Sequence, residues 1–132
     1  MPSGKLETLQ DCQDFVRGCL FMGTGGGGSV EWGMGMFEEA FAEGLALQWV
    51  DADSIPDDAL TVTPYGMGSI APQRTLSPSE RRELGYGDWI IPKPMVEAVR
   101  ELESYTGYRI EAIVPFELGA GNTTAPADAA LP

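Results

Sequence analysis

The stretch Phe21-Met22-Gly23-Thr24-Gly25-Gly26-Gly27-Gly28 decides how the first half of this chain folds. Four consecutive glycines cannot sustain a helix cheaply, because glycine loses more backbone freedom on folding than any other residue. Apolar residues recur at helical spacing before the stretch (residues 12–20) and after it (residues 32–41). We therefore predict two helices joined by a glycine loop, residues 23–28, which we call the first glycine loop.

Capping residues mark the limits of these two helices. Thr8, followed three residues later by Asp11, is typical of a helix start, and Ser29 is a suitable N-cap for the second helix. Gly44 is the expected stop. In the second helix we interpret the apolar residues as packing residues rather than a cofactor site: Trp32, Met34, Met36 and Phe37.

The remainder of the chain predicts alternating strands and helices. We expect strands at residues 45–50, buried on both faces, and at 59–63 and 108–114, with a turn at residues 56–58. Ser77 caps a short helix, and a longer helix runs from Pro94 to a stop at Gly107. This alternation favours an α/β fold with a mostly parallel or mixed sheet flanked by helices, in a single domain.

The last residues allow two interpretations. Thr123 or Thr124, with Pro126, could open a final helix, whereas residues 125–132 could instead form a loose tail.

Composition limits the classes of partner and chemistry. The chain has 132 residues, with 20 acidic and 8 basic side chains, a formal net charge of −12 and no histidine. Such a charge repels phosphate backbones and anionic membranes, so we expect neither nucleic acid nor membrane partners. Because no apolar run approaches the roughly 20 residues of a membrane span and no secretory signal is evident, we expect a cytoplasmic protein.

Two groups of residues resemble metal ligands but are interpreted as structural. Cys12 and Cys19 lie seven residues apart on one helical face, too distant for a disulfide, so we expect two buried thiols. Four aspartates lack the spacing of a calcium loop and suit turns and caps instead: Asp51, Asp53, Asp57 and Asp58. We predict no metal site, and the sequence identifies no cofactor.

Two glycine-containing loops are candidates for a small-molecule site. The first glycine loop precedes a helix, so its amides could hold a carboxylate, a phosphate or a developing oxyanion; a tight helix connection explains the same glycines equally well. In the second glycine loop (residues 115–122), Glu117 is either an acid, base or anchor, or a residue that satisfies its own turn. Asn122 either adopts a left-handed turn or belongs to the site.

Four motifs, in this order and spacing, resemble one family. They are Phe21-Met22-Gly23-Thr24-Gly25-Gly26-Gly27-Gly28, Pro56-Asp57-Asp58, Gly66-Met67-Gly68-Ser69 and Pro115-Phe116-Glu117-Leu118-Gly119-Ala120-Gly121-Asn122. Over about residues 5–130 the chain is similar to the N-terminal part of the DUF917 family, also called the S-methyl-thiohydantoin desulfurase domain. Its members are associated with hydantoinase and oxoprolinase-type enzymes that open or modify cyclic amides and thioamides.

The resemblance implies hydrolysis of a small cyclic amide, imide or thiohydantoin. It implies Glu117 as the catalytic residue. The substrate-binding residues it implies are Thr24, Gly25, Gly26, Gly27, Gly28, Gly66, Met67, Gly68, Gly119, Gly121 and Asn122.

Two departures from the family pattern shape the expected assembly. This chain has Gln73 and Arg74 where the family usually carries a Glu-Lys pair. It also stops near the point where a second family segment, rich in Asp, Gly and Arg, would begin. We therefore expect a subunit whose site is completed by a second polypeptide, or by another copy of the chain. The alternatives are a non-catalytic ligand-binding or regulatory subunit and an acidic scaffold domain.

Overall fold

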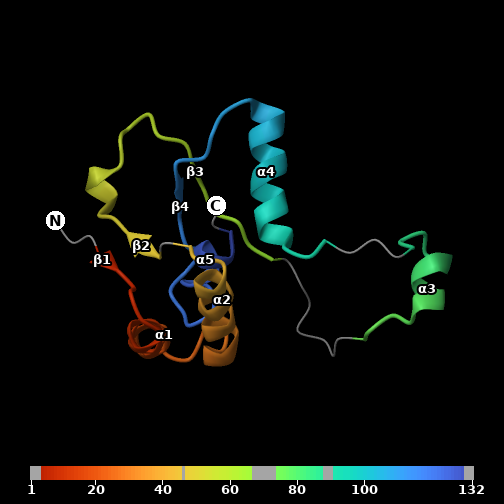
Figure 1. Ribbon diagram of the computed structural model, residues 1–132, viewed down its shortest axis with the longest axis horizontal. Helices are drawn as coiled ribbons and strands as arrows, with labels where there is room; N and C mark the ends of the chain where they lie inside the picture. The colour runs from red at the N-terminus through yellow and green to blue at the C-terminus, as the bar shows by residue number, and fades with distance from the viewer. Residues whose placement is uncertain (1–3, 46, 67–73, 88–90, 130–132) are drawn as a thin grey trace.

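The computed structural model describes residues 4–45, 47–66, 74–87 and 91–129 (Figure 1). Its helices are α1 (Leu9–Met22), α2 (Val30–Ala42), α3 (Pro78–Glu83), α4 (Pro94–Thr106) and α5 (Ala125–Ala129), with a 3₁₀ turn η1 at Ala52–Ser54. Its strands are β1 (Gly4–Lys5), β2 (Gln48–Trp49), β3 (Thr61–Val62) and β4 (Ala112–Ile113). These elements confirm the predicted α/β class.

Side-chain caps start the helices where the sequence predicts. The Thr8 hydroxyl accepts a hydrogen bond from the Asp11 amide, while the Asp11 carboxylate accepts from the Thr8 amide, which completes a capping box at the start of α1. Ser29 caps α2 through the amide of Trp32, and Ser77 caps α3.

Glycines end two of the helices in the predicted way. Gly44 follows α2 with φ 72°, and Gly107 follows α4 with φ 73°. Both values lie in the left-handed region, which glycine enters without the steric penalty of a Cβ atom. The chain can therefore reverse direction directly after each helix.

The strands are shorter than predicted and form two separate pairs. Strand β1 pairs with β2 antiparallel, and β3 pairs with β4 parallel. The prediction of a strand buried on both faces at residues 45–50 is wrong: only Gln48 and Trp49 are in β2, and both are exposed. Because β2 is bonded only to the two-residue β1, the side chain of Trp49 is only partly covered. The fold therefore combines antiparallel and parallel pairing, but in two small sheets rather than in one larger sheet.

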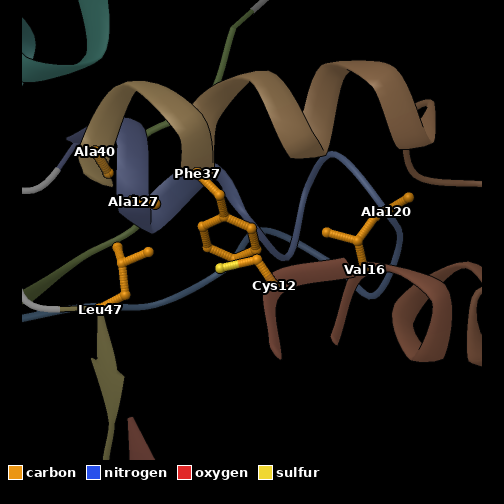
Figure 2. Close-up of a cluster of buried hydrophobic side chains, with 7 residues drawn as sticks. All are labelled: Cys12, Val16, Phe37, Ala40, Leu47, Ala120 and Ala127. Carbon is orange, nitrogen blue, oxygen red and sulfur yellow. The ribbon is translucent and has the colours of Figure 1, made fainter. Parts of the chain in front are cut away.

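The core forms where α1, α2, α5 and the second glycine loop meet (Figure 2). Phe37 of α2 points toward α1, and the Phe15 ring meets it edge-on at a centroid distance of 5.9 Å. Cys12 and Cys19 are buried free thiols, as predicted, and burial raises the pKa of both. The central buried cluster comprises Cys12, Val16, Phe37, Ala40, Leu47, Ala120 and Ala127.

The end of the described chain is part of this core. Residues 125–129, for which a loose tail was one interpretation, form α5, and its residues Ala125, Ala127 and Ala129 are buried. Their small side chains allow α5 to pack against both α2 and α4. The loose-tail interpretation is therefore wrong for these residues, whereas the predicted final helix is confirmed.

Helix α3 lies apart from the other helices, at the far right of Figure 1.

In the described part of the chain, no helix is both long enough and apolar enough to cross a membrane.

Candidate functional site

The two glycine loops contact each other directly. The carbonyl oxygen of Gly27 accepts hydrogen bonds from the amides of Gly121 and Asn122, both at 2.9 Å. A Cβ atom added to Gly119 would lie 2.4 Å from the Cα atom of Gly27, closer than real Cβ contacts allow. The glycines at this junction therefore let two backbones touch, and the structure brings together two segments almost 100 residues apart in the sequence.

Helix α2 approaches the same junction through a glycine of its own. A Cβ atom on Gly33 would lie 2.2 Å from the carbonyl oxygen of Ala120. The buried Thr124 hydroxyl donates to the carbonyl oxygens of Ala120 and Gly121, at 3.1 and 2.7 Å. Polar groups of the loop are thus satisfied inside the core, as burial requires.

Trp32 lies on the backbone of both loops. Cβ atoms added to Gly28 and Gly121 would come within 2.6 and 2.2 Å of the Trp32 indole ring. The side chain is nevertheless 46% exposed. The indole is therefore seated on the glycine junction, and part of the side chain stays accessible.

The first glycine loop is held by its own amides. The amide of Gly25 donates to the carbonyl oxygen of Leu20, and that of Gly26 donates to Gly23, so these two amides are already used. An anion-binding role for this loop stays a prediction. Its backbone is left-handed at Thr24 (φ 52°), Gly25 (89°), Gly27 (75°) and Gly28 (93°).

Strands β3 and β4 place two aromatic rings side by side. The parallel register pairs Val62 with Ile113. Three residues beyond the end of each strand, the same offset brings Tyr65 beside Phe116, and their rings stack at 5.0 Å between centroids and 29° between planes. Parallel strands end at the same edge, and in larger open α/β sheets this edge is where ligands bind.

A pocket of about 150 Å³ opens at this edge. Helix α2 contributes Trp32, the first turn of α4 contributes Met95, and the end of the second glycine loop contributes Asn122. None of the described residues that line it carries a charge. The other lining residues are Pro64, Tyr65, Gly66, Phe116 and Ala125.

A carboxylate lies beside the polar lining residue. Glu117 follows Phe116 and accepts a hydrogen bond from Nδ2 of Asn122 at 2.7 Å. The backbone oxygen of Glu117 accepts from the Thr123 hydroxyl at 3.3 Å, and that hydroxyl accepts from the Gly119 amide at 3.0 Å. The left-handed turn considered for Asn122 is wrong, because Asn122 is not among the described residues with positive φ. Its side chain instead connects the carboxylate to the pocket.

Only part of the predicted binding set, among the members that the structure describes, lines the pocket. Gly66 and Asn122 line it, while Gly27, Gly28, Gly119 and Gly121 form the junction beneath Trp32. Thr24, Gly25 and Gly26 are exposed on the first glycine loop. Met67 and Gly68 lie outside the described residues.

Sequence reasoning missed the aromatic side chains of the pocket. A signal was present: residues 63–66 read Thr-Pro-Tyr-Gly and residues 114–117 read Val-Pro-Phe-Glu, each directly after a strand. A proline followed by an aromatic residue at equivalent ends of two parallel strands indicates a shared aromatic edge.

The residues interpreted as structural take structural positions. Asp51 accepts a hydrogen bond from the Asp53 amide and caps η1. Arg74, at the altered family position, pairs with Glu80 of α3, whereas Gln73 lies outside the described residues. Within the ranges that the structure describes, no three His, Cys, Asp or Glu side chains gather as a metal site would require.

The structure is an α/β domain with a candidate ligand pocket beyond the ends of two parallel strands. Residues 10–131 match the family model described as S-Me-THD-like, N-terminal domain. The chain therefore belongs to this family, which confirms the resemblance and suggests a role related to thiohydantoin desulfurases. No curated protein and no solved structure matches the chain.

Proposed function

We propose that this domain supplies one part of the active site of a hydrolase that acts on a small cyclic amide, imide or thiohydantoin. The observation that carries the proposal is the hydrogen bond between Glu117 and Asn122 at the edge of the pocket. It holds a carboxylate next to an uncharged, ring-lined space, an arrangement suited to moving a proton to or from a bound ring. Membership of the family supports the class of substrate.

Glu117 acts as the proton carrier in this scheme. Its carboxylate takes a proton from water as the water oxygen bonds to an electrophilic ring carbon, and the electron pair of the attacked C=O, C=N or C=S bond moves onto its heteroatom. When that pair returns, the carbon breaks its bond to the ring nitrogen or to the thiol sulfur. The leaving atom receives the proton from Glu117, so the net change is the addition of one water molecule across the broken bond.

A second polypeptide, or another copy of this chain, completes the site. Two features support this part of the proposal. The matching model describes an N-terminal domain. Tyr65 and Phe116 at the pocket edge are 55% and 54% exposed, which leaves aromatic surface for a covering segment.

The test is a Glu117→Gln substitution in the assembled enzyme. Glutamine keeps the shape and an oxygen to accept from Asn122, but it cannot take a proton. We expect kcat to fall by about 10²- to 10⁴-fold, the usual contribution of general acid–base catalysis. Glu101→Gln, at an exposed position on α4, is the matched control and should leave the rate unchanged.

A near-unchanged rate in Glu117→Gln, with folding shown intact by circular dichroism, would remove Glu117 from the mechanism. The domain would then be better described as a ligand-binding or regulatory subunit.

A further inference from the structure

The side chain of Asn122 has hydrogen-bonding capacity left over. A carboxylate accepts but does not donate, so Nδ2 rather than Oδ1 of Asn122 faces Glu117. A carboxamide has two N–H donors and one oxygen acceptor. The contact with Glu117 uses one donor, which leaves one N–H and the oxygen available to a ligand in the pocket that Asn122 lines.

A donor and an acceptor on one carboxamide match the edge of a cyclic amide. In a five- or six-membered ring the amide is forced to be cis, so its N–H and its C=O lie on the same side and can form two parallel hydrogen bonds. Open-chain secondary amides are almost always trans and present these groups on opposite sides. Asn122 therefore discriminates rings from open-chain secondary amides by geometry.

The other pocket walls favour a flat and uncharged ligand. Trp32, Tyr65 and Phe116 provide aromatic surfaces, and no charged side chain is among the described lining residues. The pocket, at about 150 Å³, is smaller than the roughly 300–1,000 Å³ of sites for drug-sized ligands. Glu117 and the net charge of −12 repel a ligand that carries a carboxylate.

We infer that this pocket recognises an uncharged five- or six-membered ring through its cis amide or thioamide, with Asn122 as a two-point anchor and the aromatic side chains as walls. The inference rests on the proposed function for the kind of ring, and it adds the residues that select it. It also accounts for product release, because opening the ring at a carbonyl carbon creates a carboxylate beside Glu117.

The ligand arm of the test compares three compounds by calorimetric titration of the 132-residue chain. Hydantoin has the cis amide, 1,3-dimethylhydantoin has the ring without an N–H donor, and N-carbamoylglycine is the ring-opened acid. We expect hydantoin to bind about tenfold or more tightly than either of the others, since 1,3-dimethylhydantoin lacks the N–H donor and N-carbamoylglycine carries a carboxylate that Glu117 and the net charge of −12 repel. Equal affinity for all three, or no binding of hydantoin, overturns the inference.

The protein arm compares Asn122→Ala with Tyr105→Leu. Alanine removes both hydrogen bonds, so hydantoin binding should weaken by about tenfold or more. Tyr105 on α4 is 91% exposed and lines no part of the pocket, so its replacement should leave affinity unchanged. Thermal melting checks that both variants fold, and unaltered binding by folded Asn122→Ala overturns the inference.

Failure here differs from failure of the proposed function. If hydantoin does not bind through Asn122 but Glu117→Gln still abolishes turnover, the recognition scheme is wrong and the catalytic proposal survives. If hydantoin binds through Asn122 but Glu117→Gln turns over normally, the recognition scheme survives and the catalytic proposal is wrong.

Discussion

The glycine junction and the pocket edge are neighbours that are built in opposite ways. At the junction, backbone touches backbone, and the Gly27 carbonyl bonds two amides of the second glycine loop. At the pocket edge, the side chains of Tyr65 and Phe116 stack on each other and remain about half exposed. Trp32 joins the two regions, because its ring rests on the junction and lines the pocket.

This difference distinguishes the residues that pack the fold from the residues that line the pocket. The glycines are the most conspicuous feature of the sequence, yet several of them serve to let α2 and two loops approach closely. Much of the pocket lining comes from less conspicuous residues that follow β3 and β4. A conspicuous glycine loop is therefore evidence of close packing as much as of ligand binding.

The largest expected effect comes from breaking the junction with Gly33→Ala. Its new Cβ atom would meet the backbone carbonyl of Ala120 at 2.2 Å, so α2 and the second glycine loop must separate. Overpacking of this kind typically costs about 1–3 kcal/mol, and we expect the upper end because the obstacle is backbone. Urea unfolding followed by circular dichroism measures the loss.

Gly35→Ala on the same helix is the matched control. A Cβ atom there meets nothing within 4 Å. Alanine in a helix interior should therefore stabilise the protein by about 0.5–1 kcal/mol. Similar stabilities for the two variants would contradict the assignment of the junction as a tightly packed scaffold.

A smaller change in stability is expected from Asp128 of α5, the helix that packs against α2 and α4. Burial raises the pKa of Asp128, the nearby carboxylates of Glu39 and Glu43 raise it further, and Lys93 opposes them. A raised pKa means that the ionised form is disfavoured in the folded state. Asp128 thus contributes stability below its ordinary pKa of 3.8, and this contribution is lost as pH rises through the folded-state value.

Asp128→Asn should therefore raise the melting temperature modestly at neutral pH, and the gain should disappear in acid. Asp11 provides a comparison of opposite sign, because hydrogen bonds with Thr8, chiefly its side chain, lower the pKa of Asp11. Its contribution is present at neutral pH and is lost as pH falls through its folded-state value. If Asp128→Asn leaves the melting temperature at neutral pH unchanged, or lowers it, the folded state does not disfavour the ionised Asp128 carboxylate.

Local signals predicted the helices well and the site only in part. The capping box at Thr8, the Ser29 cap and the Gly107 stop depend on neighbours within a few residues, so the sequence predicts them directly. The pocket depends on the register that places residue 65 beside residue 116, which is set by long-range pairing. The predicted strand at residues 45–50 was wrong for the same kind of reason, since its burial depended on a partner strand that is only two residues long.

The most direct test of the pocket as the functional site is a map of ligand contacts in solution. Amide and indole NMR signals of the ¹⁵N-labelled chain would be followed during titration with hydantoin. Our account predicts that the largest shifts occur at Trp32, Gly66, Glu117 and Asn122, with little change at Thr24 to Gly26 of the first glycine loop. Shifts that centre on that loop and spare the ends of β3 and β4 would contradict it.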